Sequence, residues 1–170
     1  IINLLEARIN VLEKSLMNSL STSLYSDGTG TAGKEVGGLQ LIVADAGTGT
    51  VGGINSSTFT FWQNAQTTAT SSAFSVANVQ ADMNTIYLSL VRGADSPDLV
   101  MAGTNAYTAF LGSLQAIQRI TSDDLATSGF TSLQYLNSDV VFDSACSTNR
   151  MYFLNTDYLR LEVAAARDFV

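Results

Sequence analysis

A chain of 170 residues, 46% of them apolar, can form one domain with a sizeable core, or one domain with an appendage. It has no histidine, one cysteine and 14% charged residues, whereas about a quarter of a soluble domain is usually charged. Catalytic sites usually recruit histidine, clustered carboxylates, an activated thiol or a metal, so this composition argues against an enzyme. The net charge of −7 argues against a primary nucleic-acid binder, which needs lysine and arginine for the phosphates. A surface with few charges favours a subunit of a larger assembly.

The sequence shows no sign of a membrane segment or of secretion. No apolar run reaches the roughly 18 residues that span a bilayer, and no signal peptide is recognisable. Cys146 has no second cysteine to pair with, which suits a reducing compartment, and we interpret it as a small core or loop residue. The chain begins at Ile1 inside an expected helix, so we expect a piece of a longer polypeptide.

A long amphipathic helix is expected over residues 1–24. Its apolar residues recur at steps of three and four, which places them on one stripe: Ile2, Leu5, Ile9, Leu12, Leu16 and Leu20. At 1.5 Å per residue the helix is about 36 Å long. Such a stripe needs a partner, because packing stabilises most protein helices. The partner is either the core of the same chain or a neighbouring subunit.

Two glycine-rich stretches follow the expected helix. Residues 25–38 form a flexible loop and the best candidate for a domain boundary. Residues 39–44 are a short apolar run that predicts a buried strand. After the second stretch, residues 47–53, the pattern of residues 58–62 predicts a strand with Phe59 and Phe61 on one face.

The rest of the chain alternates between expected helices and strands. A helix is expected over residues 72–92, with Val76, Val79, Met83, Ile86 and Leu90 buried, and a second one from Thr104 to Ile117. A polar loop covers residues 121–131. Strands are expected at 99–102, 133–136, 140–142, 151–154 and 158–163, and Asn137-Ser138-Asp139 joins the second and third of these as a hairpin.

The first glycine stretch has the spacing of a phosphate-binding P-loop over Gly28 to Lys34. In that motif serine or threonine follows the lysine and holds magnesium, whereas here Glu35 would repel the phosphates. The stretch also follows a helix, whereas a P-loop joins a strand to a helix. We therefore expect a plain loop.

The second stretch, Gly47 to Gly52, matches a dinucleotide-binding fingerprint. That fingerprint needs a helix immediately after it and an acid about 20 residues later. Residues 53–61 are poor helix formers, and no acid occurs between Asp45 and Asp82. We expect no catalytic residue, no metal ligand and no cofactor in this chain, and a nucleotide-using enzyme built on this loop remains an alternative. The richness of the whole chain in serine, threonine and glycine leaves a secreted adhesion-type module as a further alternative function.

An ordered set of segments in the second half carries a resemblance to a known family. A helix ends at Leu90-Val91-Arg92, and the strand Pro97-Asp98-Leu99-Val100-Met101 follows. Then come the helix around Tyr107-Thr108-Ala109-Phe110-Leu111, the segment Asp139-Val140-Val141-Phe142-Asp143, and the stretch 151–159. This order resembles the major capsid proteins of tailed double-stranded-DNA bacteriophages. The family often has Gly-x-Pro before the Val-Val pair, where this chain has Asn137-Ser138-Asp139.

The resemblance implies an α+β fold: a long spine helix and an axial domain with a mixed or antiparallel sheet flanked by helices. Residues 1–35 would be the spine helix and crossing loop of a partial peripheral domain, and residues 36–170 the axial domain. Leu5, Ile9, Leu12 and Leu16 would be the main packing support of the peripheral unit.

The function that the resemblance implies is that of a shell subunit in the virion, assembled in the host cytoplasm. Its partners would be copies of itself in hexamers and pentamers, with portal, scaffold or decoration proteins as further candidates. The shell would enclose DNA without binding it specifically. A bacterial encapsulin-like compartment shares the fold and remains the alternative, which neighbouring genes would distinguish: terminase and portal genes for a phage, a cargo enzyme for a compartment.

Overall fold

The computed structural model describes residues 2–70, 73–115 and 133–160, so the expected loop at 121–131 lies outside the described part. The chain divides into two compact units, Ile1–Thr68 with Ser144–Ser147 and Ala69–Asp143 with Thr148–Val170. The first of these units ends its main segment at Thr68, and the division after residue 35 that the resemblance implied stays a prediction. Helices and two sheets make the chain α+β, as expected.

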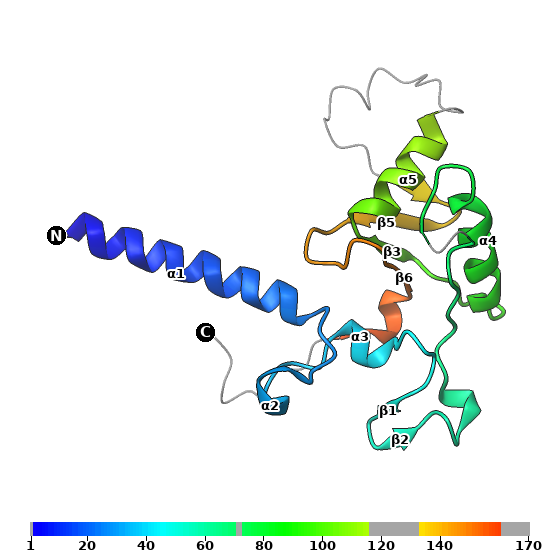
Figure 1. Ribbon diagram of the computed structural model, residues 1–170, viewed down its shortest axis with the longest axis horizontal. Helices are drawn as coiled ribbons and strands as arrows, with labels where there is room; N and C mark the ends of the chain where they lie inside the picture. Colours follow the sequence, from blue (N-terminus) through cyan, green and yellow to red (C-terminus); the bar gives the residue numbers. More distant parts are fainter. Residues whose placement is uncertain (1, 71–72, 116–132, 161–170) are drawn as a thin grey trace. The chain divides into compact units, whose positions relative to one another are not determined.

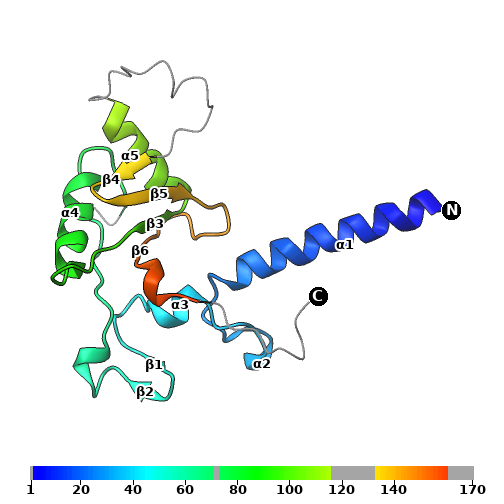
Figure 2. The same ribbon diagram turned by 180° about the vertical axis from the view of Figure 1, so that it is seen from behind.

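The first unit begins with α1 (Ile2–Ser23), a helix of 22 residues (Figures 1 and 2, blue). Neither glycine nor proline occurs within it, so nothing in the sequence interrupts its backbone hydrogen bonds. The last turn tightens, because the N–H groups of Tyr25 and Ser26 donate to carbonyls three residues earlier. The helix predicted over residues 1–24 is therefore confirmed, with a C-terminal end that differs by one residue, while residue 1 lies outside the described part.

Residues 24–38 form a loop that returns to the end of α1. The N–H of Gly38 donates to the Ser26 carbonyl (3.0 Å), and the N–H of Leu39 donates to the Leu24 carbonyl (2.7 Å). The Ser26 hydroxyl donates to the Val36 carbonyl (2.8 Å). A Cβ at Gly38 would lie 2.3 Å from the carbonyl oxygen of Leu24, so this close approach requires glycine.

Gly38→Ala is expected to lower the free energy of unfolding by about 2 kcal/mol, because the added methyl overlaps with backbone rather than with a movable side chain. Thermal denaturation measures the effect. Gly49→Ala is the matched control, since its Cβ would meet nothing closer than 4.0 Å. Equal melting temperatures for the two variants would contradict the expectation.

Two strand predictions in the first unit are wrong. Residues 39–44 contain a four-residue helix, α3 (Leu39–Ile42), which forms because the carbonyl of Gly38 accepts the N–H groups of Leu41 and Ile42. None of the four helical residues is buried. Residues 58–62 contain a 3-10 turn, η1 (Thr60–Trp62), closed by the Trp62 N–H, which donates to the Phe59 carbonyl at 2.9 Å.

A small hairpin forms where the second glycine stretch was expected to be a loop. Strands β1 (Thr50–Val51) and β2 (Ile54–Asn55) pair antiparallel. The residues between them, Gly52 and Gly53, both have positive φ angles, of 59° and 80°. Those angles are typical of the type I′ turn that matches the twist of a two-residue hairpin.

The second unit contains a sheet with the strand order β4-β5-β3-β6 (Figure 2). Its strands are β3 (Leu99–Ala102), β4 (Leu133–Tyr135), β5 (Ser138–Phe142) and β6 (Met151–Leu154). Strand β3 is parallel to β5, and the other two pairings are antiparallel. The four strands predicted there are confirmed, although the hairpin turn lies at Leu136-Asn137, where Leu136 has a φ of 54°.

The fifth predicted strand, at 158–163, is wrong in its described part. A 3-10 turn, η2 (Thr156–Tyr158), follows β6, because the side chain of Asn155 accepts the N–H of Asp157 and starts a turn. Residues 161–163 lie outside the described part of the chain.

Helices α4 (Val79–Leu90) and α5 (Thr104–Gln115) pack on the face of the sheet that carries Val100 and Val140. Helix α4 is shorter than predicted, so Val76 lies before it and is exposed, while Tyr87 is buried instead. The end predicted for α5, Ile117, lies outside the described residues. The buried core cluster consists of Val79, Met83, Tyr87, Val100, Ala109, Phe110, Leu133, Tyr135 and Val140.

Candidate functional site

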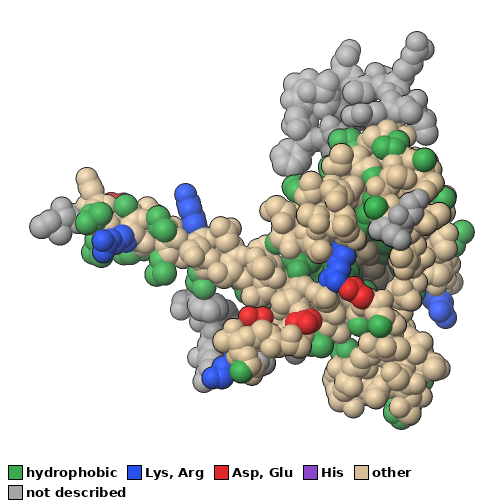
Figure 3. All heavy atoms as spheres, in the orientation of Figure 1, with side chains coloured by type: hydrophobic (Ala, Val, Ile, Leu, Met, Phe, Trp, Pro, Cys, Tyr) green, Lys and Arg blue, Asp and Glu red, His purple; other side chains and the backbone are tan. Residues whose placement is uncertain are grey.

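The apolar stripe of α1 is the most prominent candidate surface. The structure places the four predicted packing residues on one helix face, and they are exposed: Leu5 by 63%, Ile9 by 55%, Leu12 by 70% and Leu16 by 56%. Figure 3 shows hydrophobic side chains along this helix. The described part of the chain therefore does not bury the stripe.

The energetic consequence of that exposure is large. Burying one leucine or isoleucine side chain contributes about 1.5–3 kcal/mol relative to leaving it in water. Leucine and isoleucine side chains adjacent on one helix face form a contiguous patch, and such patches usually mark association surfaces. This arrangement can bind an apolar partner, but it holds no group that could do chemistry.

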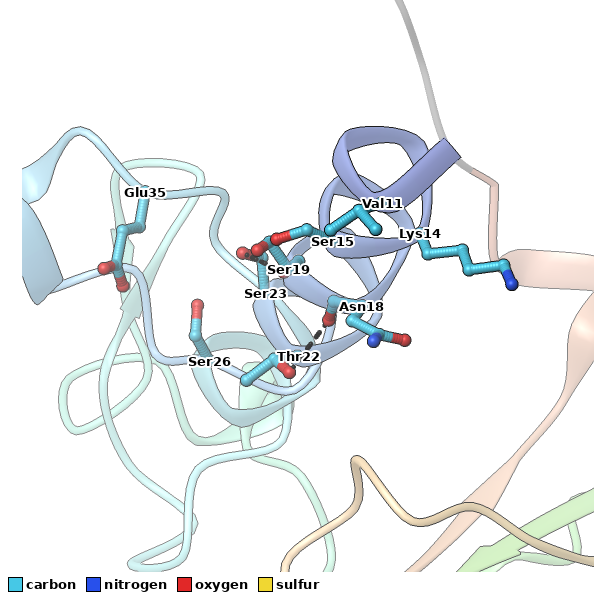
Figure 4. A pocket seen from close by; sticks show the side chains of 9 residues that line it. All are labelled: Val11, Lys14, Ser15, Asn18, Ser19, Thr22, Ser23, Ser26 and Glu35. Atoms are coloured by element: carbon cyan, nitrogen blue, oxygen red, sulfur yellow. Dashed lines mark hydrogen bonds between the residues drawn. The ribbon is translucent and has the colours of Figure 1, made fainter. Parts of the chain in front are cut away.

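A pocket of about 610 Å³, lined mostly by polar side chains, lies beside the C-terminal half of α1 (Figure 4). Three of its hydroxyls, on Thr22, Ser23 and Ser26, already donate to backbone carbonyl oxygens at 2.8–3.0 Å. Lys14 and Glu35 lie at opposite sides of the pocket in Figure 4, so they do not converge on one point. The lining residues are Val11, Lys14, Ser15, Asn18, Ser19, Thr22, Ser23, Ser26 and Glu35.

The first glycine stretch does not have the geometry of a P-loop. It follows α1, and its short turn α2 (Gly30–Gly33) has left-handed backbone angles at Thr31 and Ala32. A phosphate-binding loop needs successive N–H groups at the start of a regular helix. The Glu35 carboxylate accepts a hydrogen bond from the Thr31 hydroxyl (3.1 Å), which places negative charge beside this loop.

The second glycine stretch leads into the β1–β2 hairpin, whereas a dinucleotide site needs a helix there. The buried Ser56 side chain already forms hydrogen bonds with backbone groups of the loop that such a site would need for its ligand. Its hydroxyl accepts the N–H of Gly49 (2.8 Å) and donates to the carbonyl of Gly49 (3.0 Å). This loop is therefore closed on itself by its own serine.

An exposed aromatic cluster in the first unit consists of Phe59, Phe61 and Trp62. Phe61 makes edge-on contacts with both neighbours, at centroid distances of 6.0 Å to Phe59 and 6.5 Å to Trp62. The three side chains are exposed by 50%, 78% and 47%, respectively. No periodicity in the sequence predicts this cluster, although the absence of any charged residue between Asp45 and Asp82 is a signal of an uncharged surface.

The aspartates near β3 stabilise a turn. The Asp98 carboxylate accepts the hydroxyl and the N–H of Thr156, the latter at 2.8 Å, and these hydrogen bonds lower the pKa of Asp98. The Tyr158 hydroxyl donates to Asp95 at 3.1 Å, which raises the pKa of Tyr158. Both contacts join the start of β3 to η2, which is a structural role.

Asp98→Asn is expected to lower the free energy of unfolding at pH 7 by about 1 kcal/mol, because a neutral amide accepts the Thr156 hydrogen bonds less strongly. Because the pKa of Asp98 is lower in the folded state, its ionised carboxylate stabilises the fold at pH values above the unfolded-state pKa of about 3.9. This stabilisation is lost as the pH falls through the folded-state pKa. The difference between wild type and variant therefore shrinks below about pH 4.

Urea unfolding at several pH values measures this difference, and Asp157→Asn, at the exposed neighbouring carboxylate, is the control. A difference that stays constant from pH 7 to pH 3 would contradict the role of the Asp98 charge.

Cys146 is buried, with 3% of its surface exposed, and so is shielded from solvent reagents. Within the described ranges, no group of three or more Cys, Asp or Glu side chains is placed to hold a metal ion. No helix among these residues combines the length and apolar character needed to cross a bilayer.

Comparison with known proteins gives no match for this chain, either among family models, among curated proteins or among solved structures.

Proposed function

We propose that this chain is a structural shell subunit of the kind from which tailed double-stranded-DNA phages build their heads, and that it assembles with copies of itself. The observation that carries this proposal is the exposed apolar stripe at Leu5, Ile9, Leu12 and Leu16. Contact with another protein surface is favourable for such a face, because it removes apolar area from water. The face carries no group that could react with a small molecule.

The order of elements in the second unit supports the same proposal. Helix α4, strand β3, helix α5, the β4–β5 hairpin and strand β6 follow one another in the order that the resemblance implies for an axial domain. The sheet is mixed, and both helices pack on one of its faces.

The charge of the chain supports a container rather than a DNA-binding protein. A net charge of −7 and scattered basic residues leave few cations for phosphates, so an enclosed DNA would be held by the closed wall rather than by tight contacts. Many weak contacts between neighbouring subunits are sufficient for such a wall, because they act together.

Expression of the intact gene product, followed by light scattering and electron microscopy, tests the proposal. We expect rings of subunits or closed particles, and DNA rather than a cargo enzyme as their natural content. A stable monomer at micromolar concentration would contradict the proposal. Saturable micromolar binding of NAD or ATP, measured by titration, would favour the nucleotide-using alternative instead.

A further inference from the structure

The apolar stripe of α1 has the spacing of a coiled-coil seam. Leu5, Ile9, Leu12 and Leu16 are separated by four, three and four residues, so they occupy the d, a, d and a positions of a heptad repeat. Leucine at both d positions with isoleucine at the first a position fits a pair of parallel helices, while the second a position carries Leu16. All four side chains are exposed in the chain, so the seam is accessible along its length.

Charged residues of opposite sign border the two edges of this seam. Arg8 precedes Ile9 and lies at a g position on one edge, while Glu6 and Glu13 lie at e positions on the other edge. In a parallel pair of helices, a g position faces the e position five residues later on the partner. Arg8 of each copy then faces Glu13 of the other, which gives two attractive pairs.

The antiparallel arrangement lacks this complementarity. There e positions face e positions, so Glu6 of one copy lies beside Glu13 of the other, and like charges repel. Arg8 faces a g position occupied by the uncharged Ser15. The edge charges therefore fit a second copy of this helix in one direction only.

We propose that α1 pairs in parallel and in register with α1 of a second copy of this chain, through the seam at residues 5–16. The inference rests on the proposed self-assembly and specifies the surface and direction of one of its contacts. The seam ends after Leu16, because the next d and a positions are occupied by Ser19 and Ser23. So short a seam holds two copies weakly and reversibly, which suits a subunit that must sort itself into a larger structure.

Disulfide trapping in the full chain tests the pairing. In a Cys146→Ser background, Leu5→Cys places a thiol on the seam and Ala7→Cys places one on the opposite side of the same helix. We expect mild oxidation to link two copies through position 5 at least about tenfold faster than through position 7, because only the first pair of thiols comes within disulfide reach. The Cys146→Ser chain without an added cysteine is the blank.

Charge reversal tests the direction. Arg8→Glu in the Leu5→Cys chain is expected to reduce the linked product about tenfold at limiting concentration, because both attractive pairs become repulsive. Arg8→Glu combined with Glu13→Arg restores the pairs and should restore the product. Circular dichroism confirms that each variant remains folded.

Three outcomes would overturn the pairing: no linked product at position 5, equal linkage at positions 5 and 7, or preferential linkage in a mixture of Leu5→Cys with Leu16→Cys, which signals antiparallel helices. Electron microscopy of the same samples separates this inference from the proposed function. Particles without linkage at position 5 refute the pairing alone, whereas linked dimers that never form particles refute the shell alone.

Discussion

Leu12→Ala is expected to reduce the yield of assembled particles severalfold and to lower the temperature at which they dissociate. The Leu12 side chain is 70% exposed in the single chain, so its truncation changes the stability of the isolated subunit by less than about 0.5 kcal/mol. In an assembly that buries the stripe, the same truncation costs about 2–5 kcal/mol at each copy of the contact. The effect is therefore expected in assembly and not in folding.

Two measurements separate these effects: particle yield by sedimentation or electron microscopy, and subunit unfolding by urea. Val11→Ala is the matched control, because Val11 is equally exposed (67%) but lies off the stripe on the same turn of the helix. Particles of Leu12→Ala in normal number and with normal thermal stability would count against a packing role for the stripe. An equal loss for both variants would point to a general effect of helix α1.

Phe110→Ala is expected to lower the free energy of unfolding by about 3–5 kcal/mol, the largest stability effect expected in the second unit. The Phe110 side chain is 1% exposed and lies in the core cluster between the helices and the sheet. Its ring makes an edge-on contact with Tyr135 at a centroid distance of 5.9 Å, which adds to the loss of buried area.

Urea unfolding followed by near-ultraviolet circular dichroism measures this change. Leu88→Ala in α4 is the control, because Leu88 is 72% exposed, so its truncation should change the stability by less than about 0.5 kcal/mol. A loss below 1 kcal/mol for Phe110→Ala would mean that the packing around this ring is not the main support of the unit.

The sequence was most informative where local pattern and tertiary packing agree. Strand β3 alternates buried and half-buried residues and pairs Val100 with Val140 and Phe153, and its bounds are the predicted ones. Helix α4 was placed correctly but predicted too long, since Val76 continues the apolar spacing before the helix begins. The parallel pairing of β3 with β5 was not predictable, because it joins segments about 40 residues apart.

Predictions failed in the first unit, where short apolar runs lie among glycines. Residues 39–42 are equally compatible with a strand or a helix by periodicity, and the bonds to the Gly38 carbonyl decide for a helix. The alternation of Phe59 and Phe61 indicated a strand, but the 3-10 turn brings their rings into contact instead. The stripe on α1 was predictable because it is periodic, whereas the aromatic cluster depends on a turn that no periodicity reveals.

The aromatic cluster at Phe59, Phe61 and Trp62 lies in a stretch without any charged side chain. Ionic strength screens contacts between charges and leaves contacts between apolar rings intact. A surface that covered this cluster would therefore be held about equally well in dilute buffer and in concentrated sodium chloride, and cooling would loosen it, because apolar burial weakens at low temperature. Salt would weaken the Arg8–Glu13 pairs proposed at the edges of α1, whereas cooling would weaken the leucine seam and the aromatic cluster alike. Added salt is therefore the condition that distinguishes these two contacts of the same subunit.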